Sequence, residues 1–166
     1  DWAATAQGGR KYRNTVPNVW TFFNNYRDII VNLGEKYQEI TDNELRFKTY
    51  ELEDAELVIV AYGSSARISL ETLRRLRPEG YKIGLIRPIT LWPFPTQIIR
   101  DASKRIKDFL VVEDSLGQLI EDVDYAVEGR AKTHLLGSLA RHLPTSSGMI
   151  FPKAVSEEVK RILCHK

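Results

Sequence analysis

The chain has 166 residues, of which 43% are hydrophobic and 28% are charged, a balance typical of a soluble globular protein. Its 24 Lys and Arg residues exceed its 22 Asp and Glu residues by two, too small a difference to favour binding to nucleic acid or to an anionic membrane. No apolar stretch reaches the roughly 20 residues that span a bilayer. The single cysteine, Cys164, excludes an internal disulfide and is typical of a reducing compartment, so we expect a cytoplasmic protein. Because the sequence begins without Met and without signal-peptide features, we also expect an excised domain.

Residues 1–54 are predicted to be a connector followed by a long helix. The polar, glycine-containing stretch at residues 6–18 is typical of an extended connector. Apolar residues then recur at helical spacing at Phe22, Tyr26, Ile29, Leu33, Tyr37 and Ile40. Such a stripe favours a core-facing surface, or a surface for another chain, over a ligand site. Residues 1–54 contain no strong strand signal.

Residues 55–166 alternate strand and helix signals. Unbroken apolar runs, typical of strands buried on both faces, predict strands at 56–62, 82–87, 109–113 and 133–136. Apolar residues at helical spacing predict helices at 66–76, 98–106, 118–127 and 152–163. Because helical crossovers between parallel strands are right-handed and cover the faces of the sheet, we expect an α/β fold. The predicted architecture is a three-layer open sheet, mostly parallel, with residues 1–54 as its N-terminal extended and helical segment.

Ligands of open α/β sheets bind at the carboxyl ends of the strands, so the residues that follow each predicted strand are the candidates for a binding site. Gly63, Ser64 and Ser65 follow one strand, and Arg87 ends the next. Backbone N–H groups and a guanidinium could hold an anion there. Neither phosphate-binding fingerprint, G-x-x-x-x-G-K-[ST] or G-x-G-x-x-G, is present. The favoured interpretation is a strand-to-helix turn with a serine as the N-cap, and these four residues remain weak anion-site candidates.

Two carboxylates end the third predicted strand, where an acid or a base could act. Ser115 is followed three residues later by Gln118, a capping-box pattern that predicts helix initiation. Asp114 would then lie beside the positive end of the helix dipole. Glu113 has no role in that motif, and an ion pair with Arg87 is favoured for it over catalysis. The sequence therefore yields no catalytic residue.

The three histidines, His134, His142 and His165, have no metal-ligand spacing with one another or with Cys164. No G-x-S-x-G nucleophile elbow occurs either. We expect surface or packing roles for the histidines and no metal site.

A proline-rich loop with the sequence PITLWPFP follows the second predicted strand. Its prolines make it stiff, and it carries two large rings, those of Trp92 and Phe94. Rigid aromatic side chains near an exposed edge favour contacts with another protein. Covering the end of the sheet is an equally good interpretation of the same rings.

The stretch AYGSSARISLETLRRLRPEGYKIGLIRPITLWPFP, together with VVEDSLGQLIEDV, closely resembles the thiamine-diphosphate-dependent 2-oxoacid:ferredoxin oxidoreductases. It looks like the chain in which a pyrimidine-side domain is followed by a transketolase-C-terminal-like domain. The resemblance extends upstream through Trp2–Thr5, Gly9-Arg10 and Tyr37–Ile40. These pieces are most similar to the branched-chain type, which acts on 2-oxoisovalerate. The sequence departs from the family at Asp114–Leu116, where an Asn is common, and at Leu136–Arg141, where a Gly-rich turn is common.

The resemblance implies that residues 55–166 form a transketolase-C-terminal-like domain that serves structure and subunit assembly and binds no cofactor itself. Thiamine diphosphate, Mg²⁺ and iron–sulfur clusters would lie elsewhere in the full enzyme, with CoA as co-substrate. That enzyme oxidatively decarboxylates a 2-oxoacid to an acyl-CoA and passes electrons to ferredoxin. The implied partners are the other subunits and the upstream pyrimidine-side domain, within an oligomer. The interface or structural candidates are Trp92, Phe94, Glu113, Gly117 and Gln118.

Two alternatives remain open at this point. One is a free-standing α/β module that binds an anionic small molecule, a CoA or a nucleotide phosphate, at the carboxyl edge of the sheet. The other is the C-terminal domain of a different thiamine-dependent enzyme.

Overall fold

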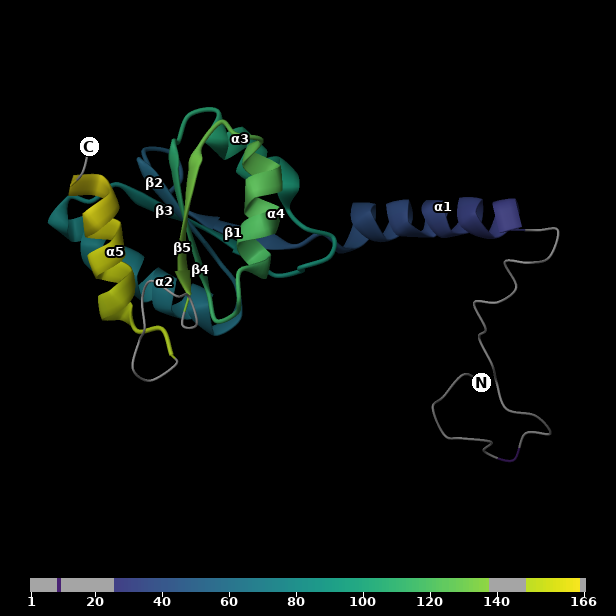
Figure 1. Cartoon of the computed structure of the whole chain (residues 1–166), viewed down its shortest axis with the longest axis horizontal. Helices are drawn as coiled ribbons and strands as arrows, with labels where there is room; N and C mark the ends of the chain where they lie inside the picture. Colours follow the sequence, from purple (N-terminus) through teal and green to yellow (C-terminus); the bar gives the residue numbers. More distant parts are fainter. Residues whose placement is uncertain (1–8, 10–25, 138–148, 165–166) are drawn as a thin grey trace. The chain divides into compact units, whose positions relative to one another are not determined.

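The computed structural model describes Gly9 and residues 26–137 and 149–164 (Figure 1). The chain divides into two compact units, Asp1–Asp42 and Asn43–Lys166. The second unit is larger than the expected domain because it also includes residues 43–54.

Helix α1 spans Tyr26–Glu44 and confirms the helix expected in the first part of the chain. Its stripe of large exposed side chains consists of Tyr26, Ile30, Leu33 and Tyr37. None of the residues of α1 is buried. Phe22, the first residue of the predicted stripe, lies outside the described residues.

Five strands form one sheet in the order β1-β3-β2-β4-β5. Strands β2 to β5 are parallel to one another, whereas β1 is antiparallel to β3. The expectation of a mostly parallel α/β sheet is confirmed. The strand bounds are Phe47–Tyr50, Leu57–Ala61, Ile83–Pro88, Asp108–Glu113 and Lys132–Gly137.

Strand β1 lies within residues 1–54, where no strong strand was expected. Its four residues pair with Leu85–Pro88 of β3, with Phe47 opposite Pro88. The strand gives no apolar run because it is short, lies at the edge of the sheet and exposes Phe47, Lys48 and Thr49. Edge strands are commonly short and polar, which protects the sheet from pairing with other chains.

Helices cover both faces of the sheet, which confirms the three-layer architecture (Figure 1). Helix α2 (Gly63–Leu76), followed by the short helix η2 (Arg77–Glu79), packs beside α5 (Pro152–Cys164). Helix α3 (Thr96–Ser103) packs beside α4 (Gln118–Val127) on the other face. Alternate strand residues supply the two cores: Leu57 and Ile59 lie in one, and Val58 and Val60 in the other.

Two arginines hold the connector between β1 and β2 at the amino edge of the sheet. Arg77 donates to the carbonyl oxygen of Glu51 at 2.7 Å, to Oδ1 of Asp54 at 2.6 Å and to the carbonyl oxygen of Ile83 at 2.9 Å. Arg105 donates to the carbonyl oxygen of Ala55 at 3.1 Å. The hydrogen bond from Arg77 lowers the pKa of the Asp54 carboxyl group below its ordinary value of 3.8.

Replacing Arg77 by leucine should therefore return the pKa of Asp54 toward 3.8, which a carboxyl-detected NMR titration would measure. A carboxyl group with a lowered pKa stabilises the fold above its unfolded-state pKa and loses that contribution as the pH falls through its folded-state pKa. As the pH falls through the folded-state pKa of Asp54, the free energy of unfolding should therefore fall less in the Arg77→Leu variant than in the wild type. In the control, Arg105→Leu, the pKa of Asp54 should stay low. An Asp54 titration that is identical in wild type and Arg77→Leu would contradict this assignment.

Candidate functional site

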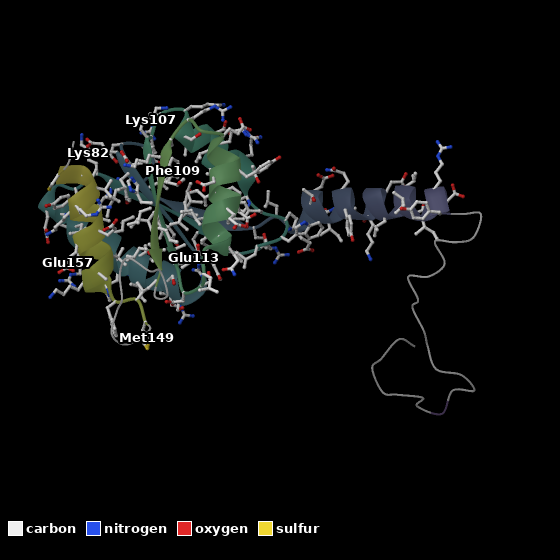
Figure 2. All side chains as sticks on the ribbon, viewed as in Figure 1. Lys82, Lys107, Phe109, Glu113, Met149 and Glu157 are labelled. Carbon is white, nitrogen blue, oxygen red and sulfur yellow. The ribbon has the colours of Figure 1, made fainter. Side chains whose placement is uncertain are left out.

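The carboxyl edge of the sheet is the candidate site, because three connectors that carry the candidate residues meet there. The segments that follow β2, β3 and β4 comprise residues 62–65, of which 63–65 are the first residues of α2, and the connectors 89–95 and 114–117. Figure 2 shows Glu113 and Met149 toward this edge, and Lys82 and Lys107 toward the opposite one. The topology alone brings these segments to one edge, since parallel strands end on the same side.

Glu113, the last residue of β4, is fully buried and caps helix α4. Its Oε2 accepts the backbone N–H of Leu119 at 2.9 Å, and its Oε1 accepts that of Ile120 at 3.2 Å. The Ser115 hydroxyl also donates to Oε2. A carboxylate at a helix N-terminus satisfies orphan N–H groups and complements the helix dipole. The side chain of Glu113 thus stabilises the N-terminus of α4.

This arrangement corrects two expectations about the same residues. The predicted capping box is wrong, because the N-cap of α4 is Gly117, with no side-chain cap, and the Ser115 hydroxyl goes to Glu113 instead. Gln118 acts locally, since its Oε1 accepts the backbone N–H of Leu116 at 3.1 Å. Gly117 has a φ of 110°, which favours glycine at that position. The expected ion pair between Glu113 and Arg87 is absent from the described part of the chain.

The turn after β2 starts helix α2 directly at Gly63, whose φ of +56° is left-handed. The expected serine N-cap is wrong: Tyr62 occupies that position without a side-chain cap. Ser65 instead donates its hydroxyl to Oδ2 of Asp114 at 3.3 Å. A carboxylate therefore lies beside the first turn of α2, where its negative charge disfavours an anionic ligand.

Arg87 is the remaining anion candidate, and it is partly buried in β3. Its Nε is buried and has no hydrogen-bond partner among the described residues. Its neighbour across the strand pair is Lys48 of β1. The structure thus joins Ser65 to Asp114 through a hydrogen bond but does not join Arg87 to Glu113.

The two rings of the proline-rich loop have different environments. Phe94 is half-buried and packs against the core between the sheet and helices α3 and α4, whereas Trp92 is 58% exposed. The hydroxyl of Thr90 stabilises the loop, since it donates to the carbonyl oxygen of Pro93 at 3.0 Å and accepts the backbone N–H of Arg46 at 3.0 Å. The ring of Phe94 therefore covers the end of the sheet, whereas that of Trp92 lies largely at the surface.

Sequence reasoning missed a pairing at the other end of β4 and β5. Nε2 of His134 lies 3.0 Å from Oδ1 of Asp108, and both side chains are largely buried. The only signal in the sequence is the two-residue period, which places both on one face of the sheet once the register of the two strands is known. His134 therefore has the packing role that was expected, whereas His142 and His165 lie outside the described residues.

The acidic side chains at the carboxyl edge have hydrogen-bond partners within the chain. Glu113 and Asp114 are engaged in the hydrogen bonds given above, and no group of three or more His, Cys, Asp and Glu side chains suited to a metal ion occurs among residues 26–137 and 149–164. An iron–sulfur cluster needs several cysteine thiolates, and the sequence has only Cys164. Among the described helices, none is both long and apolar enough to cross a membrane.

The chain thus has a mostly parallel α/β sheet with one antiparallel edge strand, and Glu113 at the carboxyl edge of this sheet caps α4. The family model described as pyruvate:ferredoxin oxidoreductase core domain II matches residues 55–146, more than half of the chain. The chain belongs to this family, and the resemblance noted from the sequence is confirmed.

Curated relatives agree with this assignment. The ketoisovalerate oxidoreductase subunit VorB of Methanothermobacter marburgensis is 40% identical over 114 residues, which cover 69% of this chain and 32% of the relative. The 2-oxoglutarate synthase subunit KorA of the same organism is 36% identical over 112 residues, covering 68% of this chain and 26% of the relative. The chain thus spans about a quarter to a third of the length of these relatives.

Solved structures confirm the fold. A 2-oxoglutarate:ferredoxin oxidoreductase from Magnetococcus marinus, with 2-oxoglutarate, coenzyme A and succinyl-CoA bound, matches with a TM-score of 0.68 at 19% identity, over 94% of this chain and 25% of that chain. A split-gene transketolase, an inactive β4 tetramer, matches with a TM-score of 0.58 at 17% identity, over 72% of this chain and 42% of that chain.

Proposed function

We propose that this chain is the transketolase-C-terminal-like module of a subunit of a 2-oxoacid:ferredoxin oxidoreductase that acts on 2-oxoisovalerate. In this proposal residues 55–166 are the module, and residues 1–54 are its connector and leading helix. The match of residues 55–146 to core domain II is the observation that carries it. The higher identity to the ketoisovalerate subunit, 40% against 36% for the 2-oxoglutarate subunit, supports 2-oxoisovalerate as the substrate.

The module contributes structure and assembly and has no turnover of its own. The whole enzyme removes CO₂ and two electrons from the 2-oxoacid, transfers the acyl group to the thiol of CoA and passes the electrons to ferredoxin. In this proposal thiamine diphosphate, Mg²⁺ and the iron–sulfur clusters are held by other parts of the enzyme, because Glu113 and Asp114 at the carboxyl edge are engaged in hydrogen bonds within the chain and the chain has one cysteine. The partners are the other subunits, the pyrimidine-side domain and, through the complex, ferredoxin. We place this oligomeric enzyme in the cytoplasm.

The test is to express the full-length gene together with its neighbouring genes and to assay the purified complex. We expect bound iron and a CoA-dependent reduction of a viologen dye, with kcat/KM highest for 2-oxoisovalerate and lower for pyruvate and 2-oxoglutarate. Copurifying iron–sulfur subunits would also exclude another thiamine enzyme, such as a transketolase. Complete absence of 2-oxoacid-dependent reduction in a complex that is loaded with iron would refute the proposal.

A free-standing anion-binding module is the second candidate, because the Nε of Arg87 has no partner among the described residues and α2 begins without a side-chain cap. The carboxylate of Asp114 beside Ser65 opposes it. Saturating CoA or pyrophosphate should therefore raise the Tm of this chain by less than about 1 °C in a thermal-shift measurement, since only a ligand that binds the folded state stabilises it. A dose-dependent rise in Tm that Arg87→Ala abolishes would favour this second candidate instead.

A further inference from the structure

Most cationic side chains of the second unit have a partner, but four that have none come together in the fold. In the described part of Asn43–Lys166, the Lys and Arg side chains with neither an ion pair nor a hydrogen bond are Lys48, Arg67, Arg74, Arg75, Arg87 and Lys132. We call four of them, Lys48, Arg67, Arg74 and Arg87, the basic patch.

Two cations of the basic patch lie directly opposite each other, Lys48 on β1 and Arg87 on β3. Opposite residues of an antiparallel pair have Cβ atoms about 4.5–5.5 Å apart, and like charges at such positions destabilise the pair. Both side chains lie on the face of the sheet that α2 covers, because Tyr50 and Leu85, two residues away along each strand, pack in the core on that face. The buried Nε of Arg87 has no partner among the described residues. The pair therefore lacks an anion that would offset its repulsion.

Helix α2 supplies the other two cations from the side that faces β1. A helical spacing of three, four and three residues places four positions on one side of this helix: Arg67, Leu70, Arg74 and Arg77. Arg77, at the end of this row, donates to the carbonyl oxygen of Glu51, the residue that follows β1. Because α2 packs on β3, the neighbour of β1, the exposed side chains of Arg67 and Arg74 lie on the same side of the molecule as the opposed pair.

The acidic side chains of the neighbouring segments do not neutralise the basic patch. Glu51 and Asp54, which follow β1, pair with Arg77. Glu71 lies on α2 itself, but it has no ion pair with any described residue. Guanidinium groups bind carboxylates through paired, charge-assisted hydrogen bonds. The basic patch is therefore complementary to a surface that presents several carboxylates.

We propose that the basic patch binds an acidic segment of a different subunit in the assembled enzyme, with a carboxylate of that segment between Lys48 and Arg87. This inference rests on the proposed function, which makes the chain part of a multi-subunit enzyme, as the names of its relatives state for them. A single exposed ion pair contributes little, so a free small anion gains little here, whereas several carboxylates on one docked segment act together. The net charge of only +2 disfavours nucleic acid as the occupant.

Carbodiimide cross-linking of the assembled enzyme tests the inference, because this reagent joins a lysine amine to a carboxylate only where the two are in contact. The full-length subunit in its complex is treated, digested and analysed by peptide mass spectrometry. Lys48 reports on the basic patch. Lys132 is the matched control, since it is also an exposed lysine of an edge strand without an ion pair among the described residues. The product of Lys160 with Glu79, which lie 2.9 Å apart, shows that the reaction has taken place.

We expect Lys48 to be joined to an Asp or Glu residue of a different subunit and Lys132 to form no such product. The yield of the Lys48 product should fall at least fivefold in Arg67→Glu and less than twofold in Arg75→Glu. Both variants reverse the charge of an exposed arginine of α2, but Arg75 follows Thr72 on the side of the helix where Thr72 bonds to the first residue of α5. Equal falls in the two variants would overturn the inference.

Two other results would also overturn the inference: a Lys48 product with a peptide of the same polypeptide, or no Lys48 product in a sample where Lys160 and Glu79 are joined. Nucleic acid or a small anion as the occupant would give the second of these results. The cross-link and the proposed function fail separately. A Lys48 cross-link to another subunit in a complex without 2-oxoacid-dependent reduction would refute the function and leave the binding surface. An active enzyme without this cross-link would keep the function and refute the binding surface.

Discussion

Replacing Glu113 by alanine is expected to lower the free energy of unfolding of this chain by about 3 kcal/mol, one of the two largest effects predicted here. The carboxylate is fully buried and accepts the backbone N–H groups of Leu119 and Ile120 and the hydroxyl of Ser115. Alanine leaves these donors without a partner at the N-terminus of α4 and removes buried side-chain volume. The unsatisfied donors and the lost packing both destabilise the folded state.

Urea unfolding followed by circular dichroism measures this effect, with two further variants. Glu113→Gln keeps one carbonyl acceptor and most of the volume, so it should lose about half as much as Glu113→Ala, roughly 1–2 kcal/mol. Glu121→Gln changes an exposed residue of the same helix and should shift stability by less than about 0.5 kcal/mol. If Glu113→Ala were as stable as Glu121→Gln, the capping role of Glu113 would be wrong.

The second large effect is expected for Gly84→Ala, with a loss of about 2–3 kcal/mol from overpacking. Gly84 is the second residue of β3, where the connector between β1 and β2 approaches the strand closely. A Cβ atom at this position would lie 2.7 Å from Cδ2 of Leu52 and 2.9 Å from the backbone oxygen of Glu51. The backbone oxygen cannot move freely because Arg77 binds it at 2.7 Å. The strand or the connector must therefore shift.

Gly63→Ala is the matched comparison, since it adds the same methyl group where there is space for it. No atom lies within 4 Å of the position a Cβ would take at Gly63, and only its φ of +56° disfavours alanine. The expected loss is about 1 kcal/mol, the cost of a left-handed conformation for a residue with a side chain. Thermal unfolding of both variants decides the point: a Tm for Gly84→Ala at or above that of Gly63→Ala would contradict the close approach of the connector.

Local patterns were sufficient for the elements that the sheet buries on both faces. The runs at 56–62 and 109–113 correspond to β2 and β4, and the helix predicted at 118–127 has the same bounds as α4. Strand β1 could not be found this way, because at the edge it exposes three of its four residues and has no apolar run. Its existence depends on pairing with β3, which is far away in the sequence.

The candidate site shows the same limit. The spacing of Ser115 and Gln118 indicated a local cap, but a buried carboxylate ending a strand is a stronger acceptor, and Glu113 lies close enough to reach the first N–H groups of α4. The contact between Ser65 and Asp114 joins two connectors 49 residues apart, so no local motif could reveal it. Position at the carboxyl edge was predictable; the assignment of hydrogen bonds at that edge was not.

The two rings of the proline-rich loop are a third example of what the sequence could not decide. The sequence placed Trp92 and Phe94 on one stiff loop and left open whether they contact a partner or cover the sheet. The structure gives the two rings different environments, because Phe94 packs against the core and Trp92 is 58% exposed.

The central claim is that this module contributes to the structure and assembly of the enzyme and takes no part in its chemistry. The kcat of the Glu113→Gln enzyme tests this claim most directly. The variant is assayed in the full complex with saturating 2-oxoacid and CoA, and the rate is divided by the amount of assembled enzyme. The account predicts a lower Tm with a kcat within twofold of the wild type, because in the proposed function the carboxylate caps a helix and takes no part in the reaction. A kcat reduced a hundredfold or more at an unchanged Tm would show instead that Glu113 acts in the reaction.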